Sequence, residues 1–409
     1  MRSAVFLIAA HASLLLACTT AASPAAYADE APPSPVAALQ RGLAQEPNDA
    51  ALAFFLAVFE ARAGNRDAAF EALKQTLANG NGFLPTAEVF PALAGDPRFA
   101  VMRARFERRL PRKVDGTVRF ALRDRALIPE GIAFDDRTRR FYVGSIAKRG
   151  IFAVQSSGEL RALSRPEDDL DAILGLAIDS PRRTLYAVST GALVEAGAAR
   201  PRNAVKVYDL DARKLRASIA VPEARQLNDV AVAPDGTVLV TDSAAGAVYR
   251  IDAARGTVAT VVKPDGARGA NGIAVSPDGT TAYVAANRRP LRVDLATGEV
   301  APLTVPPREN AALIDGLYWH LGALIGIQNL TTPGRVVRMA LAPDGRSVTA
   351  LHTLQSHHQP AFHEPTTAAV APDGLYVLAR TYVTRFKPDG KIEDPKTLER
   401  PLILRVPLG

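Results

Sequence analysis

The chain has 409 residues, of which 48% are hydrophobic and 22% charged, and its formal net charge is +7. This composition is typical of a globular protein with a large core and more than one domain. The positive charge is spread over single arginines and aromatic residues make up only 6%, which argues against nucleic-acid binding.

The N-terminus has the pattern of an export signal. Arg2 precedes an apolar run over residues 4–17 that is too short to span a bilayer and resembles a signal-peptide core. The only cysteine, Cys18, ends the sequence Leu-Leu-Ala-Cys, which resembles a bacterial lipobox whose cysteine is acylated. The alternative is cleavage after Ala28, behind a small-x-small signal. Residues 1–28 are therefore assigned to the signal region. Both alternatives predict an exported protein: a periplasmic or outer-membrane lipoprotein that meets the membrane only through its lipid anchor, or else a secreted one.

Helical patterning follows a predicted flexible linker, residues 19–35, which is rich in Ala, Pro and Ser. Residues 36–110 show apolar residues at helical spacing, and Gly64 and Asp67 mark the end of one helix and the start of the next. The small residues at this junction resemble a tetratricopeptide repeat. One repeat cannot bury both of its faces. This segment is thus predicted to be either a helical cap or a docking module for a protein partner.

From residue 112 to residue 409 the pattern is that of β-structure. Short runs of Val, Ile, Leu and Ala alternate with turns, and Pro-Asp-Gly recurs at residues 234–236, 277–279, 343–345, 372–374 and 388–390. In that turn Pro presets φ, Asp bonds its own backbone and Gly takes a positive φ. Units of about 47 residues with four strands each predict six blades. The expected fold is mainly β: a six-bladed β-propeller preceded by a small α-helical, tetratricopeptide-like segment. Residues 117–123 are predicted to be the outermost strand of the last blade.

One register position recurs in all six predicted blades, at intervals of about 43 to 54 residues. Its residue changes from blade to blade, in the order Glu130, Leu174, Asn228, Asn271, Asp315 and Thr366. Because a propeller places equivalent positions around its central axis, we expect the four side chains with free oxygens to ring one mouth of the channel. A simple turn requirement for Asn-Gly and Asp-Gly pairs is the alternative.

The expected ring offers an all-oxygen site for a metal ion. Two carboxylates and two amide carbonyls suit Ca²⁺, which takes six to eight oxygen ligands. Neither His nor Cys belongs to the ring, so the site is not of the usual zinc or copper type. We predict a divalent cation, with Ca²⁺ first and Zn²⁺, Mn²⁺ or Mg²⁺ as alternatives. An ion at a channel mouth can polarise a carbonyl and stabilise the oxyanion that forms during hydrolysis.

The ordered pairs Glu130-Gly131, Asn228-Asp229, Asn271-Gly272 and Asp315-Gly316 resemble the gluconolactonase/regucalcin (senescence marker protein) family of six-bladed propellers. The resemblance covers residues 112–409 and implies a lactone hydrolase that depends on a divalent metal, typically Ca²⁺. It assigns Glu130, Asn271 and Asp315 as metal ligands, and Asn228 as a metal or substrate contact. It also assigns Asp229 as a substrate contact and Asp315 as the base that activates water.

The chain departs from that family beside the third ring position. Val230 stands where the family commonly has Gly, and Gln226 stands where it has a substrate-binding Arg. These departures leave the sugar character of the substrate open. The predicted function is therefore metal-dependent hydrolysis of a lactone or ester, a small-molecule substrate. The alternative is a non-catalytic exported propeller that binds a small ligand or a protein partner. Four histidines between His352 and His363 fit no zinc spacing and are predicted to lie in a solvated loop.

Overall fold

The structure is a computed structural model, and it describes residues 34–194, 201–329, 333–387 and 389–408. The chain divides into two compact units. One contains the helices up to residue 111 together with residues 305–312, and the other contains most of the chain from residue 112 onward. Both predicted cleavage sites, including Cys18, lie outside the described residues. No helix in the part that the structure describes is long and apolar enough to cross a membrane.

The first unit is helical. Its α-helices are α2 (Pro35–Gln45), α3 (Ala50–Arg62), α4 (Arg66–Asn79) and α5 (Pro97–Glu107). Asp49 caps α3 by accepting a hydrogen bond from the Leu52 N–H at 2.9 Å, as expected for an Asp at this position. The predicted junction is confirmed, because α3 ends before Gly64, whose φ is +85°. Phe54 anchors the core, with its ring centroid 4.9 Å from that of Phe83 and 5.6 Å from that of Phe90.

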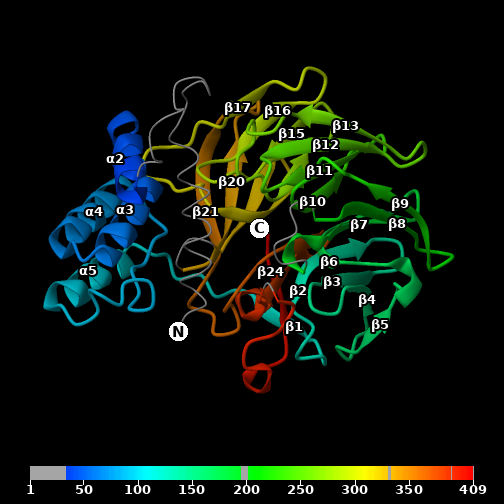
Figure 1. The fold of residues 1–409 in the computed structure, drawn as a ribbon, viewed down its shortest axis with the longest axis horizontal. Coiled ribbons are helices and arrows are strands. Elements are labelled where there is room, and N and C mark those ends of the chain that lie inside the picture. The colour runs from blue at the N-terminus through cyan, green and yellow to red at the C-terminus, as the bar shows by residue number, and fades with distance from the viewer. Residues whose placement is uncertain (1–33, 195–200, 330–332, 388, 409) are drawn as a thin grey trace. The chain divides into compact units, whose positions relative to one another are not determined.

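The second unit is a six-bladed β-propeller, as predicted (Figure 1). Each blade is a four-stranded antiparallel sheet that begins at the central channel. The first three blades contain β2 (Pro129–Asp135), β3 (Arg140–Ser145), β4 (Gly150–Val154) and β5 (Leu160–Ala162); β6 (Ala172–Asp179), β7 (Thr184–Thr190), β8 (Asn203–Asp209) and β9 (Lys214–Ala220); and β10 (Leu227–Val232), β11 (Val238–Asp242), β12 (Ala247–Asp252) and β13 (Thr257–Val262).

The last three blades follow in the same order. They contain β14 (Ile273–Val275), β15 (Thr281–Val284), β16 (Leu291–Asp294) and β17 (Val300–Pro302); β18 (Ile314–His320), β19 (Ala323–Gln328), β20 (Arg335–Leu341) and β21 (Val348–Ser356); and β22 (Ala368–Ala371), β23 (Gly374–Arg380), β24 (Leu402–Val406) and β1 (Thr117–Ala121). Short 3₁₀ turns are η3 (Pro166–Asp168), η4 (Gly191–Leu193), η5 (Val383–Arg385) and η6 (Pro395–Thr397). The predicted closure is confirmed, because β1 pairs with β24 and joins the first propeller residues to the last blade.

The Pro-Asp-Gly turns that end at Gly236, Gly279, Gly345, Gly374 and Gly390 have the expected backbone. These five glycines all have positive φ values, between +65° and +147°. This region favours glycine because a side chain would clash with the neighbouring carbonyl. In the third, fourth and sixth blades, such a turn forms the hairpin that brings the second strand back toward the channel.

An ion pair joins the first two blades. The Arg183 Nη1 lies 2.7 Å from the Asp135 Oδ1, and the Asp135 side chain is 0% exposed. Burial alone would raise the pKa of Asp135, but hydrogen bonds from Arg183 and Thr138 outweigh it and hold the pKa below its usual value. The stabilisation is therefore present above the unfolded-state pKa, about 4, and is lost as the pH falls through the lower folded-state pKa.

Replacing Arg183 by Met is expected to lower the free energy of unfolding by about 3 kcal/mol at pH 7, because it leaves a buried carboxylate without its partner. Denaturant unfolding between pH 3 and pH 7 measures this change, and the difference from wild type should shrink at the acidic end. Arg255 pairs with Asp252 on the surface, where the arginine side chain is 80% exposed. Its replacement by Met is the control, with an expected change within about 0.5 kcal/mol. Equal effects of the two substitutions would contradict the assignment.

Candidate active site at the channel mouth

In four of the six blades, the ring position lies at a β-bulge in the innermost strand. The pairing with the second strand breaks between Pro129 and Ile132, between Ile173 and Leu176, between Leu227 and Val230, and between Ile314 and Leu317. Each break spans a ring residue and the residue after it. Bulges re-aim side chains and are frequent beside active sites. The ring residues of these four blades are thereby released from the regular alternation of the strand.

Glycine follows the ring position because neighbouring blades approach closely there. A Cβ on Gly131 would lie 1.9 Å from the Leu174 carbonyl oxygen, and one on Gly272 would lie 2.3 Å from the Asp315 carbonyl oxygen. Neither glycine has the positive φ that a tight turn would require. The simple turn alternative therefore does not explain the Glu130-Gly131 and Asn271-Gly272 pairs, whereas packing around the axis does.

Two carboxyl groups of the ring are buried. Glu130 is 6% exposed and Asp315 is 7% exposed. Burial raises the pKa of Glu130 well above its usual value, and the negative charges of Asp315 and Asp229 add to the effect. Burial also raises the pKa of Asp315 to about 7, opposed by hydrogen bonds from Asn329 and Asn271. The site thus holds acidic groups that disfavour one another's ionisation.

Residues 128–317 match the family model described as "SMP-30/Gluconolactonase/LRE-like region". The propeller therefore contains an SMP-30/gluconolactonase/LRE-like region. This match includes the ring positions Glu130, Asn228, Asn271 and Asp315. No curated protein matches the sequence.

Several solved structures are similar to this chain at low sequence identity. A gluconolactonase from Xanthomonas campestris is 17% identical, with 71% of this chain and 89% of that chain covered and a TM-score of 0.47. A putative gluconolactonase is 17% identical, with 73% and 93% covered and a TM-score of 0.45. Virginiamycin B lyase from Staphylococcus aureus is 12% identical, with 73% and 99% covered and a TM-score of 0.47.

The amide ring residues of the gluconolactonase-like region are half-buried. The Asn228 Nδ2 donates to the Ser243 Oγ at 2.9 Å, and that hydroxyl donates to the Ala270 carbonyl oxygen at 2.6 Å. Because the amide nitrogen is held by Ser243, the carbonyl oxygen of Asn228 points the other way. Asn228 therefore presents an acceptor, which suits a cation or a substrate hydroxyl. Asn271 reaches the Asp315 carboxylate.

Asp229 occupies the place that glycine has in four blades. Its carboxylate accepts hydrogen bonds from the N–H of Val230 at 2.9 Å and from the N–H of Ile273, in the next blade, at 3.2 Å. Its side chain lines a cavity within the channel, which none of the four ring residues lines. Burial raises the pKa of Asp229 to about 7. Its role as a substrate contact stays a prediction.

A divalent cation fits the donor set that the ring presents. Among the described residues, Glu130 Oε2 is buried without a hydrogen-bond partner, and so is Asn329 Oδ1. Both are hard oxygen donors of the kind that Ca²⁺ takes. In the described ranges, no three residues of the types His, Cys, Asp and Glu gather as a metal site. A cation here would therefore depend on two carboxylates, Glu130 and Asp315, supplemented by amide oxygens.

Polar residues at the ends of the second strands have hydrogen-bond or ion-pair partners of their own. Asp242 accepts hydrogen bonds from the N–H groups of Arg225 and Gln226, Ser145 donates to the Leu127 carbonyl oxygen, and Arg380 pairs with Glu399. Only Asn329, among these strand ends, donates directly to a ring carboxylate, that of Asp315.

His357, His358 and His363 lie between β21 and β22, whereas His352 lies on β21 of the fifth blade, so the predicted loop is wrong for His352. The rings of His357 and His358 lie 4.0 Å apart, and the His358 Nδ1 is 2.9 Å from the Ser356 Oγ. His352 and His363 are exposed. Within the described ranges these residues form no metal-binding group.

Tyr318 is a channel residue that sequence reasoning missed. Three positions after the ring residue, five blades have alanine: Ala133, Ala177, Ala231, Ala274 and Ala369. The fifth blade has Tyr318 instead, and its phenol oxygen accepts a hydrogen bond from the Ala368 N–H at 2.6 Å. Tyr318 could have been identified from the sequence, because it is the one equivalent position of the six that is not alanine.

Proposed function

We propose that the propeller is a divalent-metal-dependent hydrolase of a lactone or ester. The observation that supports this proposal best is the pair of buried carboxyl groups, Glu130 and Asp315, with an unpartnered Glu130 oxygen between blades. No Lys or Arg contributes to the ring. Two such groups ionise together only when a cation neutralises them. The gluconolactonase-like region over residues 128–317 agrees with this chemistry.

The residues that would hold the ion are Glu130, Asn271 and Asp315, with Asn228 as a fourth ligand or a substrate contact. When bound, a divalent cation supplies Lewis-acid polarisation of the substrate carbonyl. The hydrogen bond from Asn329 fixes the Asp315 carboxylate. Asp315 then accepts a proton from the attacking water as its oxygen bonds to the carbonyl carbon. The same proton passes to the leaving alkoxide when the ester or lactone C–O bond breaks. The Asn228 carbonyl oxygen either accepts a hydrogen bond from a hydroxyl group of the substrate or faces the ion.

A substrate panel tests the proposal directly. Wild-type protein is expected to hydrolyse at least one member of a panel of sugar lactones, simple lactones and aryl esters. The reaction should be supported by Ca²⁺, Mn²⁺, Zn²⁺ or Mg²⁺ and lost with a chelator. Protein that stays inert toward the whole panel with all four metals would overturn the hydrolase proposal.

Metal binding has a readout that does not need turnover. Calcium at 100 times its dissociation constant is expected to stabilise the wild type by about 2.7 kcal/mol. Glu130→Gln removes one charged ligand, so the calcium-induced shift in unfolding temperature should largely disappear. Glu159 is a surface partner of Arg123, with its side chain 57% exposed, and Glu159→Gln is the matched control that should keep the full shift. Equal shifts in both variants would remove Glu130 from the metal site.

A non-catalytic binding propeller is the second candidate. It is favoured by a groove of about 540 Å³ on the helical unit between α4 and α5, lined in part by Phe70, Val101 and Met102. Val101 is 64% exposed and adds apolar surface to this groove. This candidate predicts calcium stabilisation without turnover. We also propose that the protein is exported and anchored by a lipid on Cys18. The sequence pattern at the N-terminus supports this proposal.

A further inference from the structure

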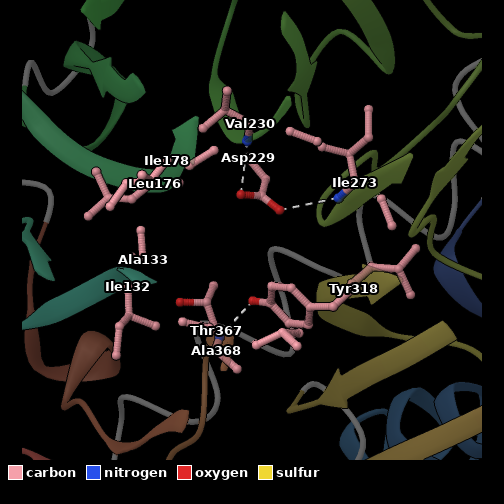
Figure 2. A pocket seen from close by; sticks show the side chains of 18 of the residues that line it. Ile132, Ala133, Leu176, Ile178, Asp229, Val230, Ile273, Tyr318, Thr367 and Ala368 are labelled. Carbon is pink, nitrogen blue, oxygen red and sulfur yellow. Dashed lines mark hydrogen bonds between the residues drawn. The ribbon is translucent and has the colours of Figure 1, made fainter. Parts of the chain in front are cut away.

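The channel contains a cavity that is distinct from the ring at its mouth (Figure 2). The cavity has a volume of about 330 Å³ and is lined by the innermost strands of the six blades. Alanines such as Ala133, Ala177 and Ala231 line it, and their small side chains leave the space open. Ligand pockets in proteins commonly measure about 300–1,000 Å³. The cavity is therefore large enough for a small organic molecule.

Most of the side chains that line this cavity are aliphatic, and Asp229, Tyr318 and Thr367 are among the polar ones. Ile132, Leu176 and Ile273 are among the aliphatic lining residues. Figure 2 shows that the Asp229 carboxylate and the Tyr318 phenol both point into the pocket. The phenol oxygen already accepts the Ala368 N–H, so its own hydrogen is left to donate. Thr367 uses its hydroxyl on the Glu130 carbonyl oxygen.

No cationic side chain lines the cavity beside the Asp229 carboxyl group. Asp229 is 8% exposed, and neither Lys nor Arg belongs to the lining residues. Its two hydrogen bonds come from uncharged backbone N–H groups, which leave further lone pairs on both oxygens. A buried carboxylate is stabilised most by a cation that also donates hydrogen bonds. One carboxylate among aliphatic walls is a poor metal site but suits an ammonium group with an apolar tail.

We propose that the channel cavity is a second ligand site, which takes a small alkylammonium with its charged head on Asp229 and its alkyl chain against the aliphatic walls. This site is separate from the mouth and goes beyond the proposed hydrolysis. A carboxylic acid is repelled by Asp229. An alcohol of the same length contacts the aliphatic walls but cannot form the charge pair with Asp229.

The chain contains a built-in reporter for the test. It has a single tryptophan, Trp319, which lines the cavity and stacks on Tyr283 with ring centroids 5.8 Å apart. Titration of the full-length protein with n-hexylammonium is expected to change the tryptophan fluorescence saturably. The dissociation constants for n-hexanol and for hexanoate should be at least about tenfold higher, since both lack the charge-assisted hydrogen bond. Asp229→Asn should weaken hexylammonium binding about tenfold and leave hexanol binding unchanged.

Two variants keep the test decisive if Asp229→Asn does not fold. Ala177→Leu and Ala231→Leu, at half-buried lining positions, should each fill the cavity and abolish the hexylammonium response. Absence of a saturable response in wild type, or equal affinity for hexylammonium and hexanol, would overturn the proposal. A response that survives both leucine substitutions and is suppressed by saturating Ca²⁺ would place the amine at the mouth, and would overturn it as well.

Discussion

Asp315→Asn is expected to lower kcat/KM for the best lactone or ester by at least about a thousandfold. A positioned general base contributes roughly 10²–10⁴-fold, and the same substitution removes one of only two charged groups in the expected metal site. The change is nearly isosteric, so Asn329 and Asn271 keep a neighbour of the same shape. Steady-state rates at saturating metal, with calcium binding measured in parallel, separate the loss of the base from the loss of the ion.

Asp344→Asn is the matched control for this prediction. Asp344 lies in an exposed Pro-Asp-Gly turn of the same blade, where its carboxylate accepts the Arg346 N–H. Its replacement should leave kcat/KM within about twofold of wild type, as expected of a surface substitution away from the chemistry. If Asp315→Asn retained more than a tenth of the wild-type rate at saturating metal, another group would have to activate the water.

The fold could be predicted from the sequence because the same β-pattern recurs six times. Period, turn chemistry and strand number all agreed on one architecture, and even the closing strand β1 was found from its place before the first blade. The sequence pattern did not identify helix α2 as a separate element within the predicted helical segment. Its 11 residues carry only a few buried side chains, among them Leu39 and Leu43. A helix this short depends on packing against its neighbours rather than on a signal of its own.

The ring residues could be located from the register, but their surroundings could not. Sequence repetition says that Glu130 and Asp315 occupy equivalent places, since equivalent positions surround the axis. It does not show the bulges that release them, nor that Asn329 donates to Asp315. Asp229 illustrates the limit: its neighbour Asn228 belongs to the ring, whereas its own carboxylate lines the cavity inside the channel. A single step along a bulged strand separates these two environments.

Gly131→Ala is expected to lower the free energy of unfolding of the propeller by at least about 3 kcal/mol, at the upper end of the overpacking range. The new Cβ would lie 1.9 Å from the Leu174 carbonyl oxygen, so the backbone of the second blade would have to move. It cannot retreat freely, because a Cβ at Gly175 would itself lie 2.6 Å from the Asp229 Cα. The bulges of successive blades thus abut one another around the axis. Denaturant unfolding measures the loss, and calcium binding should weaken with it because Glu130 moves too.

Gly256→Asn separates this clash from the general cost of replacing a glycine. Gly256 lies in the hairpin between β12 and β13, has a φ of +67° and has nothing within 4 Å of its added Cβ. Asn tolerates this left-handed region, so the expected change is below about 1 kcal/mol. A Gly131 variant as stable as the Gly256 variant would show that the channel can widen. The metal ligands would then owe their positions to something other than blade-to-blade contact.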